Sequence, residues 1–337
     1  MPASPRDLPV WALASASLRA GTPVALLCVV SSSGSSPGRQ SFKMGVTATA
    51  LAGSIGGGIM EHKFIELARQ RLQTGDSSPV LRSQVHRREA PADRSGMMCS
   101  GEQDVLLWPL TAADLPAVAA IEKALRTGTH GRWSLSLDAG LQVQLAEPVA
   151  SASPTMPTGG FPFYSYEPGP PWRYREQLGF RDHVTIVGGG HVSLALSKVL
   201  ALLDFELTVL DDRPDLPTLA ANNAAHHRRV VSYDDITTEI PSGPNQYVVV
   251  MTVGYRTDAL VLRQLLVRAG LEPCRYLGVM GSSAKVAELR RGLAEAGFSA
   301  AAIARLRGPI GLPISSQTPE EIAISVAAEL IQARHAG

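Results

Sequence analysis

The sequence is short of cysteine and of net charge, and each shortage excludes a class of protein. Its three cysteines, Cys28, Cys99 and Cys274, are widely spaced and form no Cys-x-x-Cys pair, which argues against a disulfide framework and a structural zinc site. The net charge is +1, so no general basic surface would attract nucleic acid or an anionic membrane. We therefore expect neither of these partners.

Long apolar runs are also missing. The longest, such as residues 24–30, fall far short of the ~20 residues that a membrane-spanning helix needs. The first residues carry Asp7 and lack a basic leader followed by a long apolar run, so we expect no signal peptide and a cytoplasmic location. The chain has 337 residues, 45% of them hydrophobic, which is enough for two domains with separate cores.

A strand, a glycine-rich turn, a helix and a second strand follow one another between residues 184 and 213. The apolar run 184–187 is typical of a buried strand in a parallel sheet, and three glycines at 188–190 lead from it into a helix. The second strand ends at Asp211. This order predicts a Rossmann-type unit, in which backbone N–H groups approach a phosphate and the acidic residue binds a ribose hydroxyl. Ser193 stands at the third glycine position of that fingerprint.

Two further turns in the N-terminal half have ligand-binding composition. A predicted strand at 23–30 is followed by the serine- and glycine-rich segment 31–40, which contains Arg39, a match for phosphate geometry. A second glycine turn at 56–58 precedes another predicted helix. Successive glycines cost backbone entropy on folding, so either tight backbone packing or the close approach of a ligand must compensate, and the spacing leaves both open.

The remaining pattern defines the domain organisation. Helical periodicity covers residues 8–19, and a hairpin is predicted around residues 138–140. Strands and helices alternate after residue 180, which predicts a parallel sheet with crossover helices, and Thr318 with Glu321 matches a capping box for the last helix. The predicted fold class is α/β, with an N-terminal α/β domain (1–149), an interdomain connection that packs (150–179) and a C-terminal Rossmann-like domain (180–337).

Several short motifs, taken together, resemble one family over nearly the whole chain. Their order and mutual spacing resemble those of the xanthine dehydrogenase accessory protein family, also called XdhC/CoxI. The motifs are Gly34-Ser35-Ser36-Pro37, the turn at 53–58 followed by Glu61, Cys99-Ser100-Gly101, the turn at 188–192, Asp211-Asp212-Arg213, residues 276–282, residues 308–312 and residues 318–325.

The resemblance implies a function and a set of partners. Family members bind the molybdenum cofactor, shield it from oxidation, support its sulfuration through a cysteine desulfurase and help to load it into a molybdenum hydroxylase. It also implies a homodimer. The chain differs from many members at Ile59, where they carry a cysteine, and at residues 253–256, where they carry a histidine-rich segment.

Single side chains have a functional and a structural interpretation. Cys99 lies in a turn and is a candidate thiolate contact for a soft ligand or a small, half-buried residue, whereas Cys28 lies in an apolar strand and is assigned to the core. His191 either contacts a phosphate or cofactor oxygen or simply closes the turn. Asp211 is a candidate for a ribose or a pterin amine, and Glu61 is explained by the helix dipole alone.

The favoured hypothesis is a non-catalytic molybdenum-cofactor chaperone whose ligand lies between the domains. An NAD-dependent oxidoreductase and a nucleotide-sensing interaction module are the alternatives, and NAD is the alternative ligand. No catalytic residue and no metal ligand is assigned. The predicted cofactor-binding residues are Ser35, Arg39, Gly56, Gly57, Gly58, Cys99, Gly188, Gly189, Gly190, His191 and Asp211.

Overall fold

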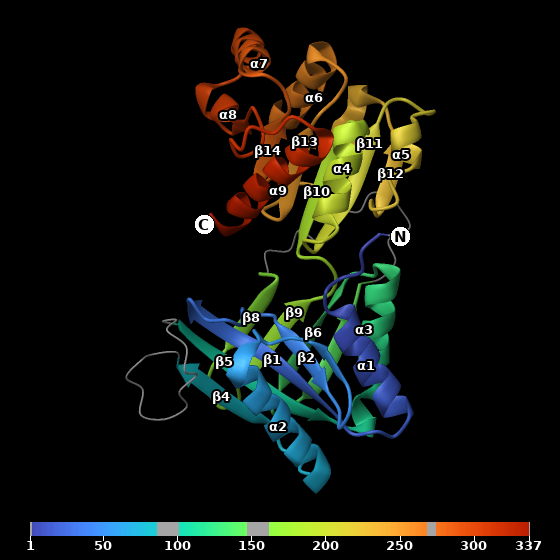
Figure 1. Ribbon diagram of the computed structural model, residues 1–337, viewed down its shortest axis with the longest axis vertical. Helices are drawn as coiled ribbons and strands as arrows, with labels where there is room; N and C mark the ends of the chain where they lie inside the picture. Colours follow the sequence, from blue (N-terminus) through green and yellow to red (C-terminus); the bar gives the residue numbers. More distant parts are fainter. Residues whose placement is uncertain (1, 86–100, 147–161, 268–273, 337) are drawn as a thin grey trace. The chain divides into compact units, whose positions relative to one another are not determined.

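The chain forms two compact units in a computed structural model that describes residues 2–85, 101–146, 162–267 and 274–336 (Figure 1). The N-terminal unit contains the described residues from 4 to 179, and the C-terminal unit contains residues 2 and 3 together with the described residues from 180 onward. The described residues 162–179, expected as part of a connection, therefore belong to the N-terminal unit. Among the described residues, no helix is both long and apolar enough to cross a membrane.

The N-terminal unit is built from two antiparallel sheets and three α-helices within its described residues. One sheet has five strands in the order β3-β2-β1-β5-β4 and the other has four in the order β7-β6-β9-β8. The elements are α1 (Leu8–Arg19), β1 (Val24–Gly34), β2 (Lys43–Val46), β3 (Leu51–Gly53), α2 (Gly58–Thr74), β4 (Val80–Val85), β5 (Gly101–Leu110), a 3₁₀ turn η1 (Ala112–Asp114), α3 (Leu115–Thr127), β6 (Gly131–Ser136), β7 (Gly140–Leu145), β8 (Tyr164–Glu167) and β9 (Arg173–Gln177).

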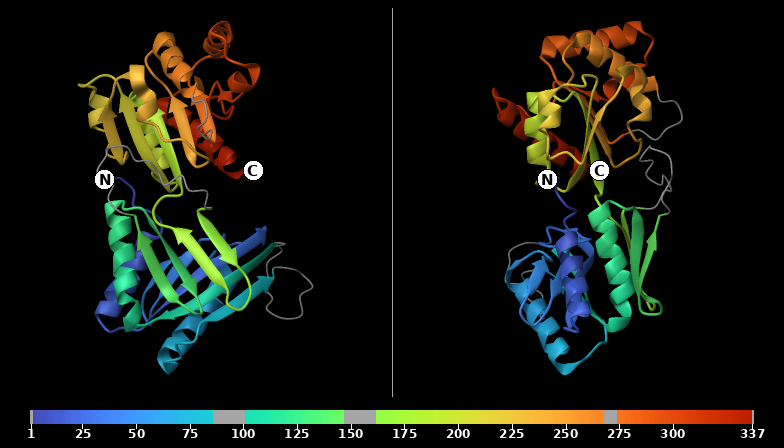
Figure 2. Two further views of the ribbon diagram at one scale, coloured as in Figure 1. Left: turned by 180° about the vertical axis from the view of Figure 1, so that it is seen from behind. Right: turned by 90° about the vertical axis from the view of Figure 1, so that its right-hand side faces the viewer.

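Strand β1 is buried on both faces because its side chains alternate between two cores. Leu26 and Cys28 pack into a core with α1, α3 and the four-stranded sheet, whereas Leu27 and Val29 pack into a core under α2. Helices α1 and α3 lie side by side (Figure 2). The core position predicted for Cys28 is confirmed, since its side chain has no exposed surface.

A buried ion-pair network fixes β9 to the rest of the N-terminal unit. The Nζ atom of Lys43 on β2 lies 2.6 Å from Asp7 Oδ2 and 2.7 Å from Glu176 Oε1 on β9, and the hydroxyl of Tyr174 donates to Glu176 Oε2 at 2.5 Å. Burial lowers the pKa of Lys43, but the two carboxylates outweigh this effect and raise it. Breaking such a pair leaves an uncompensated buried charge, so the network holds β9 within this unit.

The C-terminal unit has a parallel six-stranded sheet in the order β12-β11-β10-β13-β14-β15. This is the strand order 3-2-1-4-5-6 of a Rossmann domain, so the predicted fold class is confirmed. The elements are β10 (Asp182–Val187), α4 (His191–Leu200), β11 (Phe205–Asp211), α5 (Pro217–Ala220), β12 (His227–Val230), a 3₁₀ segment η2 (Tyr233–Thr238), β13 (Gln246–Val250), α6 (Tyr255–Val267), β14 (Tyr276–Val279), α7 (Ser283–Glu295), α8 (Ala300–Ala304), β15 (Leu306–Arg307) and α9 (Pro319–His335).

Helices cover both faces of the parallel sheet. Helices α4 and α9 lie side by side in front of the sheet in Figure 1 and share one core with Val184 and Ile186. Helices α6 and α7 share the opposite core with Val187. Because successive side chains of a strand point to opposite faces, β10 contributes to both cores.

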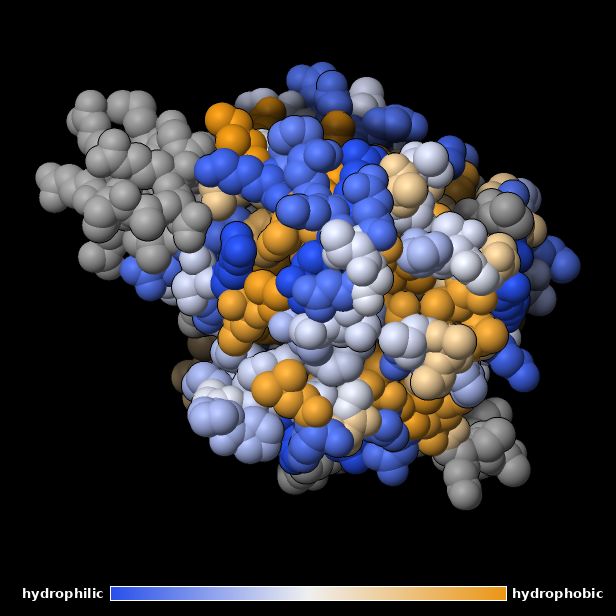
Figure 3. All heavy atoms as spheres, turned by 90° about the horizontal axis from the view of Figure 1, so that it is seen from below, coloured by the Kyte–Doolittle hydropathy of each residue, from blue (hydrophilic) through white to orange (hydrophobic). Residues whose placement is uncertain are grey.

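The surface is mixed in character. On the face shown in Figure 3, apolar residues are interspersed among hydrophilic ones. Single exposed apolar side chains are normal for a folded protein. Two examples are Ile59, directly after the glycine turn at 56–58, and Val253, between β13 and α6. Ile59 is 60% exposed and Val253 is 76% exposed.

The structure corrects one expected strand boundary. Strand β1 extends through Gly34, beyond the expected end at residue 30, because Ser31–Gly34 pairs with the first residues of β5 after a bulge. The loop with Arg39 therefore begins at Ser35. The helix Leu8–Arg19, the hairpin of β6 and β7, and the capping box at Thr318 are confirmed.

A carboxylate between two histidines should make the stability of the C-terminal unit depend on pH. Glu206 Oε2 lies 2.8 Å from His183 Nδ1, and Glu206 Oε1 lies 2.8 Å from His227 Nε2. Burial raises the pKa of Glu206, but the hydrogen bonds from both imidazoles outweigh burial and hold it well below its ordinary value of 4.5. The unfolded chain therefore binds a proton more readily, and this contribution is lost as the pH falls through the folded-state pKa.

We expect Glu206→Gln to lower the free energy of unfolding by about 1–3 kcal/mol near pH 7, because the hydrogen bonds lose their charged acceptor. The difference from the wild type should shrink as the pH falls below about 4. Denaturant unfolding of the full chain at a series of pH values measures it, with Glu288→Gln at an exposed pair with Arg291 as the control. A difference that does not change with pH would contradict the assignment.

Candidate functional site

Three N-terminal segments that the sequence singled out are packed backbone to backbone. A Cβ atom on Gly56 would lie 2.4 Å from the backbone nitrogen of Gly38, and one on Gly38 would lie 2.2 Å from the carbonyl oxygen of Ile55. A Cβ atom on Gly101 would lie 2.3 Å from the nitrogen of Ser36. Tight packing therefore accounts for Gly56, whose φ of 123° also favours glycine. The serine-rich loop, the glycine turn and the start of β5 form one cluster.

Glu61 organises the glycine turn from inside. Its Oε2 atom accepts hydrogen bonds from the Ser54 hydroxyl at 2.5 Å, the Ile55 N–H at 2.9 Å and the Gly57 N–H at 3.0 Å. The Ser54 hydroxyl oxygen in turn accepts the N–H of Gly56 at 3.1 Å. The sequence explained Glu61 by its interaction with the helix dipole alone. The structure shows that Glu61 also accepts three hydrogen bonds from the glycine turn.

The other predicted residues of this region lie at the surface. Ser35 is exposed and follows the end of β1. Arg39 is exposed, and its guanidinium donates to the carbonyl oxygen of Gly34 at 2.8 Å, which closes the loop. Gly57 has open space at the position of a Cβ atom. Cys99 lies outside the described residues, so its predicted contact stays a prediction.

In the C-terminal unit, the glycine turn at 188–190 lies where the strand order of the sheet reverses. Strands β11 and β13 flank β10 on opposite sides, so the end of β10 is the switch point at which open α/β sheets bind ligands. A Cβ atom on Gly188 would lie 2.3 Å from the carbonyl oxygen of Met251, just after β13. Gly188, with a φ of 112°, therefore brings the ends of these two strands into contact.

Asp211 braces this turn as Glu61 braces the other. Its Oδ2 atom accepts the N–H of Gly189 at 2.7 Å and lies 2.8 Å from Arg213 Nη2, while its Oδ1 atom accepts the N–H and Nε–H of Arg213 at 3.0 and 2.8 Å. Burial raises the pKa of Asp211, but Arg213 and the Gly189 N–H outweigh it and lower the pKa. Both oxygens are engaged, so ribose binding would require the Arg213 pair to open, and that role stays a prediction.

Internal hydrogen bonds leave few donors in the two turns. Gly188 N–H donates to Leu210 O at 2.7 Å, in addition to the contacts of Gly56, Gly57 and Gly189 given above. Among the described residues, no acceptor contacts the N–H of Gly58 or of Gly190, and α2 and α4 have no side-chain cap. By contrast, α7, α8 and α9 are capped by Ser282, Ser299 and Thr318.

Two side chains complete the turn at the start of α4. His191 is exposed at the first position of the helix. Ser193, at the third glycine position, is 1% exposed, and its hydroxyl has no partner among the described residues. Of the polar groups at this turn, the Gly190 N–H and the exposed His191 side chain are the candidates for a ligand contact. Within the described part of the chain, no group of three or more His, Cys, Asp or Glu side chains could hold a metal ion.

An ion pair that the sequence did not predict lies at the same edge of the sheet, beyond the ends of β13 and β14. The buried Asp258 accepts the N–H of Thr252 at 3.1 Å and forms an ion pair with Lys285. Lys285 Nζ also donates to the carbonyl oxygen of Met280 at 3.1 Å. Asp258 and Lys285 join the segments that follow β13 and β14. The signal in the sequence was their position, since each lies in the first turn of a helix that follows a strand end.

Comparisons with known proteins agree with this architecture. The XdhC Rossmann domain family matches residues 184–330, and the XdhC and CoxI family matches residues 17–84. The fold resembles the crystal structure of a xanthine dehydrogenase from Bacillus halodurans, with a TM-score of 0.64 and 22% sequence identity over 96% of this chain and 95% of that one.

Two curated relatives match the sequence. The uncharacterized protein YqeB of Escherichia coli is 28% identical over 323 residues, which are 93% of this chain and 44% of that protein. A probable xanthine dehydrogenase subunit of Bacillus subtilis is 27% identical over 154 residues, which are 46% of this chain and 43% of that protein. The matched region thus spans less than half of each relative. With the two family matches in chain order on the two units, these findings show that the chain belongs to the XdhC and CoxI family.

Proposed function

We propose that this protein is an accessory protein of a molybdenum hydroxylase of the xanthine dehydrogenase type, and that it binds the molybdenum cofactor and supports its insertion. Membership of the XdhC and CoxI family supports an accessory role toward xanthine dehydrogenase. The names of the relatives from B. subtilis and B. halodurans both refer to xanthine dehydrogenase. The client enzyme, a cysteine desulfurase partner and a homodimer belong to the proposal.

One observation carries the proposal: each unit has a braced glycine turn with an N–H group that lacks an acceptor among the described residues. Gly58 and Gly190 carry these groups, at the starts of α2 and α4. The N-terminus of a helix carries a partial positive charge, so it suits the phosphate of a pterin cofactor. The two turns lie in different units, and their use by one ligand stays a prediction.

The residues present fit an anionic ligand that bears a phosphate. In the C-terminal unit, Gly190 would donate its N–H and His191 would offer an imidazole; in the N-terminal unit, Gly58 would donate its N–H, with Ser35 and Arg39 nearby in the packed cluster. The bound cofactor supplies redox chemistry to the client. The role of this chain is to hold and orient it, and no covalent step is needed.

Gly190→Ala tests the C-terminal turn with little effect on folding. Gly190 has a φ of −70°, and a Cβ atom there meets no atom within 4 Å, so alanine fits. Its methyl group would occupy the space that a bound anion needs. We expect the full chain, copurified from a molybdopterin-producing host, to carry oxidisable pterin and molybdenum, and the variant to carry about tenfold less, which corresponds to about 1.4 kcal/mol.

The control for this experiment is Lys198→Ala in the last turn of α4, which should retain the wild-type cofactor content. Pterin is measured by the fluorescence of its oxidised form and molybdenum by elemental analysis. If neither pterin nor molybdenum copurifies with the wild-type chain in any preparation, the proposed function is wrong.

The strand order favours one second candidate, the binding of NAD. An acidic residue at the end of the second strand of a Rossmann unit selects NAD through the ribose, and Asp211 holds that position. Because Asp211 is engaged by Arg213 and Gly189, we expect no saturable NADH binding at concentrations up to about 1 mM, where the binding free energy is only about −4 kcal/mol.

A fluorescence titration of the full chain with NADH measures this, with Asp211→Ala as the comparison. Saturable binding by the wild type that Asp211→Ala abolishes would contradict our expectation and support the oxidoreductase or nucleotide-sensing alternative. Binding that survives Asp211→Ala would also contradict it, and would remove the ribose role from Asp211.

A further inference from the structure

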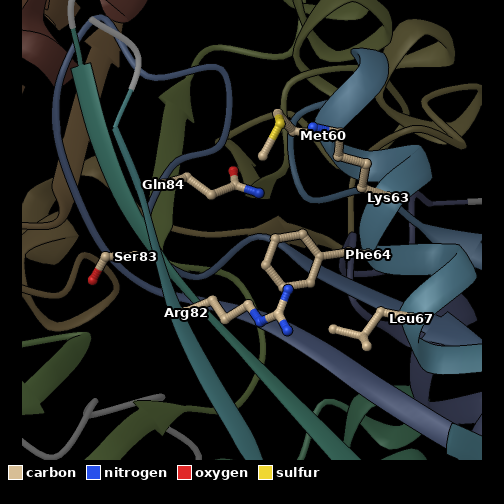
Figure 4. A pocket seen from close by; sticks show the side chains of 7 residues that line it. All are labelled: Met60, Lys63, Phe64, Leu67, Arg82, Ser83 and Gln84. Carbon is tan, nitrogen blue, oxygen red and sulfur yellow. The ribbon is translucent and has the colours of Figure 1, made fainter. Parts of the chain in front are cut away.

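We propose that a pocket between α2 and β4 binds a small organic oxyanion, a site independent of the two glycine turns and of the proposed function. The pocket has a volume of about 40 Å³ and is lined by Met60, Lys63, Phe64, Leu67, Arg82, Ser83 and Gln84. In Figure 4, the side chains of Lys63 and Phe64 from α2 and of Arg82 and Gln84 from β4 extend toward the space between the two elements.

The periodicity of each element explains why these residues meet. Met60, Lys63, Phe64 and Leu67 have the spacing i, i+3, i+4 and i+7, so they form one stripe along α2. On β4, Arg82 and Gln84 are two residues apart and share the face that carries Val80 toward the core under α2. Two cationic side chains, Lys63 and Arg82, thus line the pocket together with the apolar Met60, Phe64 and Leu67.

A relay of amide groups fixes the orientation of the buried Gln84 side chain. The N–H of Gly38 donates to Gln103 Oε1 at 2.8 Å, so the Gln103 amide must present its NH₂ group on the other side. Gln103 Nε2 then donates to Gln84 Oε1 at 2.7 Å. This contact uses the acceptor of Gln84 and directs its Nε2 donor away from Gln103.

The donor at the end of this relay has no partner. Gln84 is 2% exposed, and its buried Nε2 atom contacts no acceptor among the described residues. A buried donor without an acceptor destabilises the folded protein, so a group in the pocket that accepts its hydrogen bond would stabilise it.

The charged residues around the pocket are unbalanced in favour of cations. The carboxylates of neighbouring residues are engaged elsewhere: Glu66 pairs with Arg69, and Asp104 accepts a hydrogen bond from Ser83 at 2.5 Å. Within the part of the chain that the structure describes, neither the Lys63 ammonium nor the Arg82 guanidinium has a side-chain hydrogen bond or an ion pair. An amide donor, an ammonium and a guanidinium together recognise a carboxylate or a phosphate.

The size of the pocket limits its occupant. Its volume is about 40 Å³, roughly three times the ~10–15 Å³ that one water molecule needs. It therefore admits a carboxylate or a single phosphate group, while a nucleotide would be too large. Met60, Phe64 and Leu67 offer an apolar surface, which suits a charged group carried on an aromatic or aliphatic body.

Methyl spectra of the full chain labelled at the methionine methyl groups provide the test, because Met60 lines the pocket. The probes are sodium benzoate, sodium acetate and inorganic phosphate, each compared with sodium chloride at the same ionic strength, and Met60→Leu identifies the resonance. We expect the Met60 signal to shift with a saturating, roughly millimolar affinity for benzoate, which should bind more tightly than acetate or inorganic phosphate.

Gln84→Glu is the decisive variant, since it keeps the acceptor for Gln103 and replaces the donor in the pocket by a negative oxygen. We expect it to weaken binding about tenfold or more, whereas Gln70→Glu, on the exposed side of α2, should weaken it less than about twofold. If Gln84→Glu fails to fold, Arg82→Gln on the exposed edge strand tests the same site. A shift that follows chloride, or binding unchanged in both pocket variants, would overturn the proposal.

Discussion

Clustered backbone N–H groups in a glycine turn need hydrogen-bond acceptors, and in this protein two carboxylates supply many of them. Glu61 reaches back from the first turn of α2 to accept the N–H groups of Ile55 and Gly57. Asp211 reaches across from the neighbouring strand to accept the N–H of Gly189. Hydrogen bonds to charged groups contribute about 1.5–3 kcal/mol each, enough to order a glycine-rich segment that would otherwise favour many conformations.

This bracing determines what the turns can bind. The two carboxylates take the donors that lie inside each turn and leave the N–H groups of Gly58 and Gly190, where the helices begin. A ligand phosphate would therefore meet a small, oriented set of donors, as pre-organised anion sites require. The amide relay from Gly38 through Gln103 to Gln84 likewise uses its internal donors in hydrogen bonds and leaves one donor, Gln84 Nε2, without a partner.

The sequence predicted the parts of the fold that depend on local pattern. The Rossmann unit follows from apolar strands, glycines and helical spacing that are all close together in the chain, and the parallel sheet confirms it. The extent of the N-terminal sheet could not be predicted in the same way. Ser31–Gly34 is polar and becomes a strand only by pairing with residues 101–104, which lie about 70 positions later. Long-range pairing of this kind leaves no local signal.

In the candidate site, too, local features could be predicted from the sequence, whereas the directions of the side chains could not. The sequence identified the glycines and Asp211, since turns and strand ends have recognisable composition. It did not show that Glu61 and Asp211 would face inward, because the direction of a side chain depends on neighbours such as Arg213 and on backbone N–H groups. Likewise, nothing in the order of residues brings Lys43 to Glu176, which are 133 positions apart.

Hydrogen exchange of the full chain, with and without purified molybdopterin, measures whether the two glycine turns hold the cofactor. We expect slower exchange of the amides of Gly58 and Gly190 and of their helical neighbours when the cofactor is bound. The amides of Gly57 and Gly189, already held by Glu61 and Asp211, should change less. Bound cofactor with unchanged exchange at both turns, or no binding at all, would contradict it.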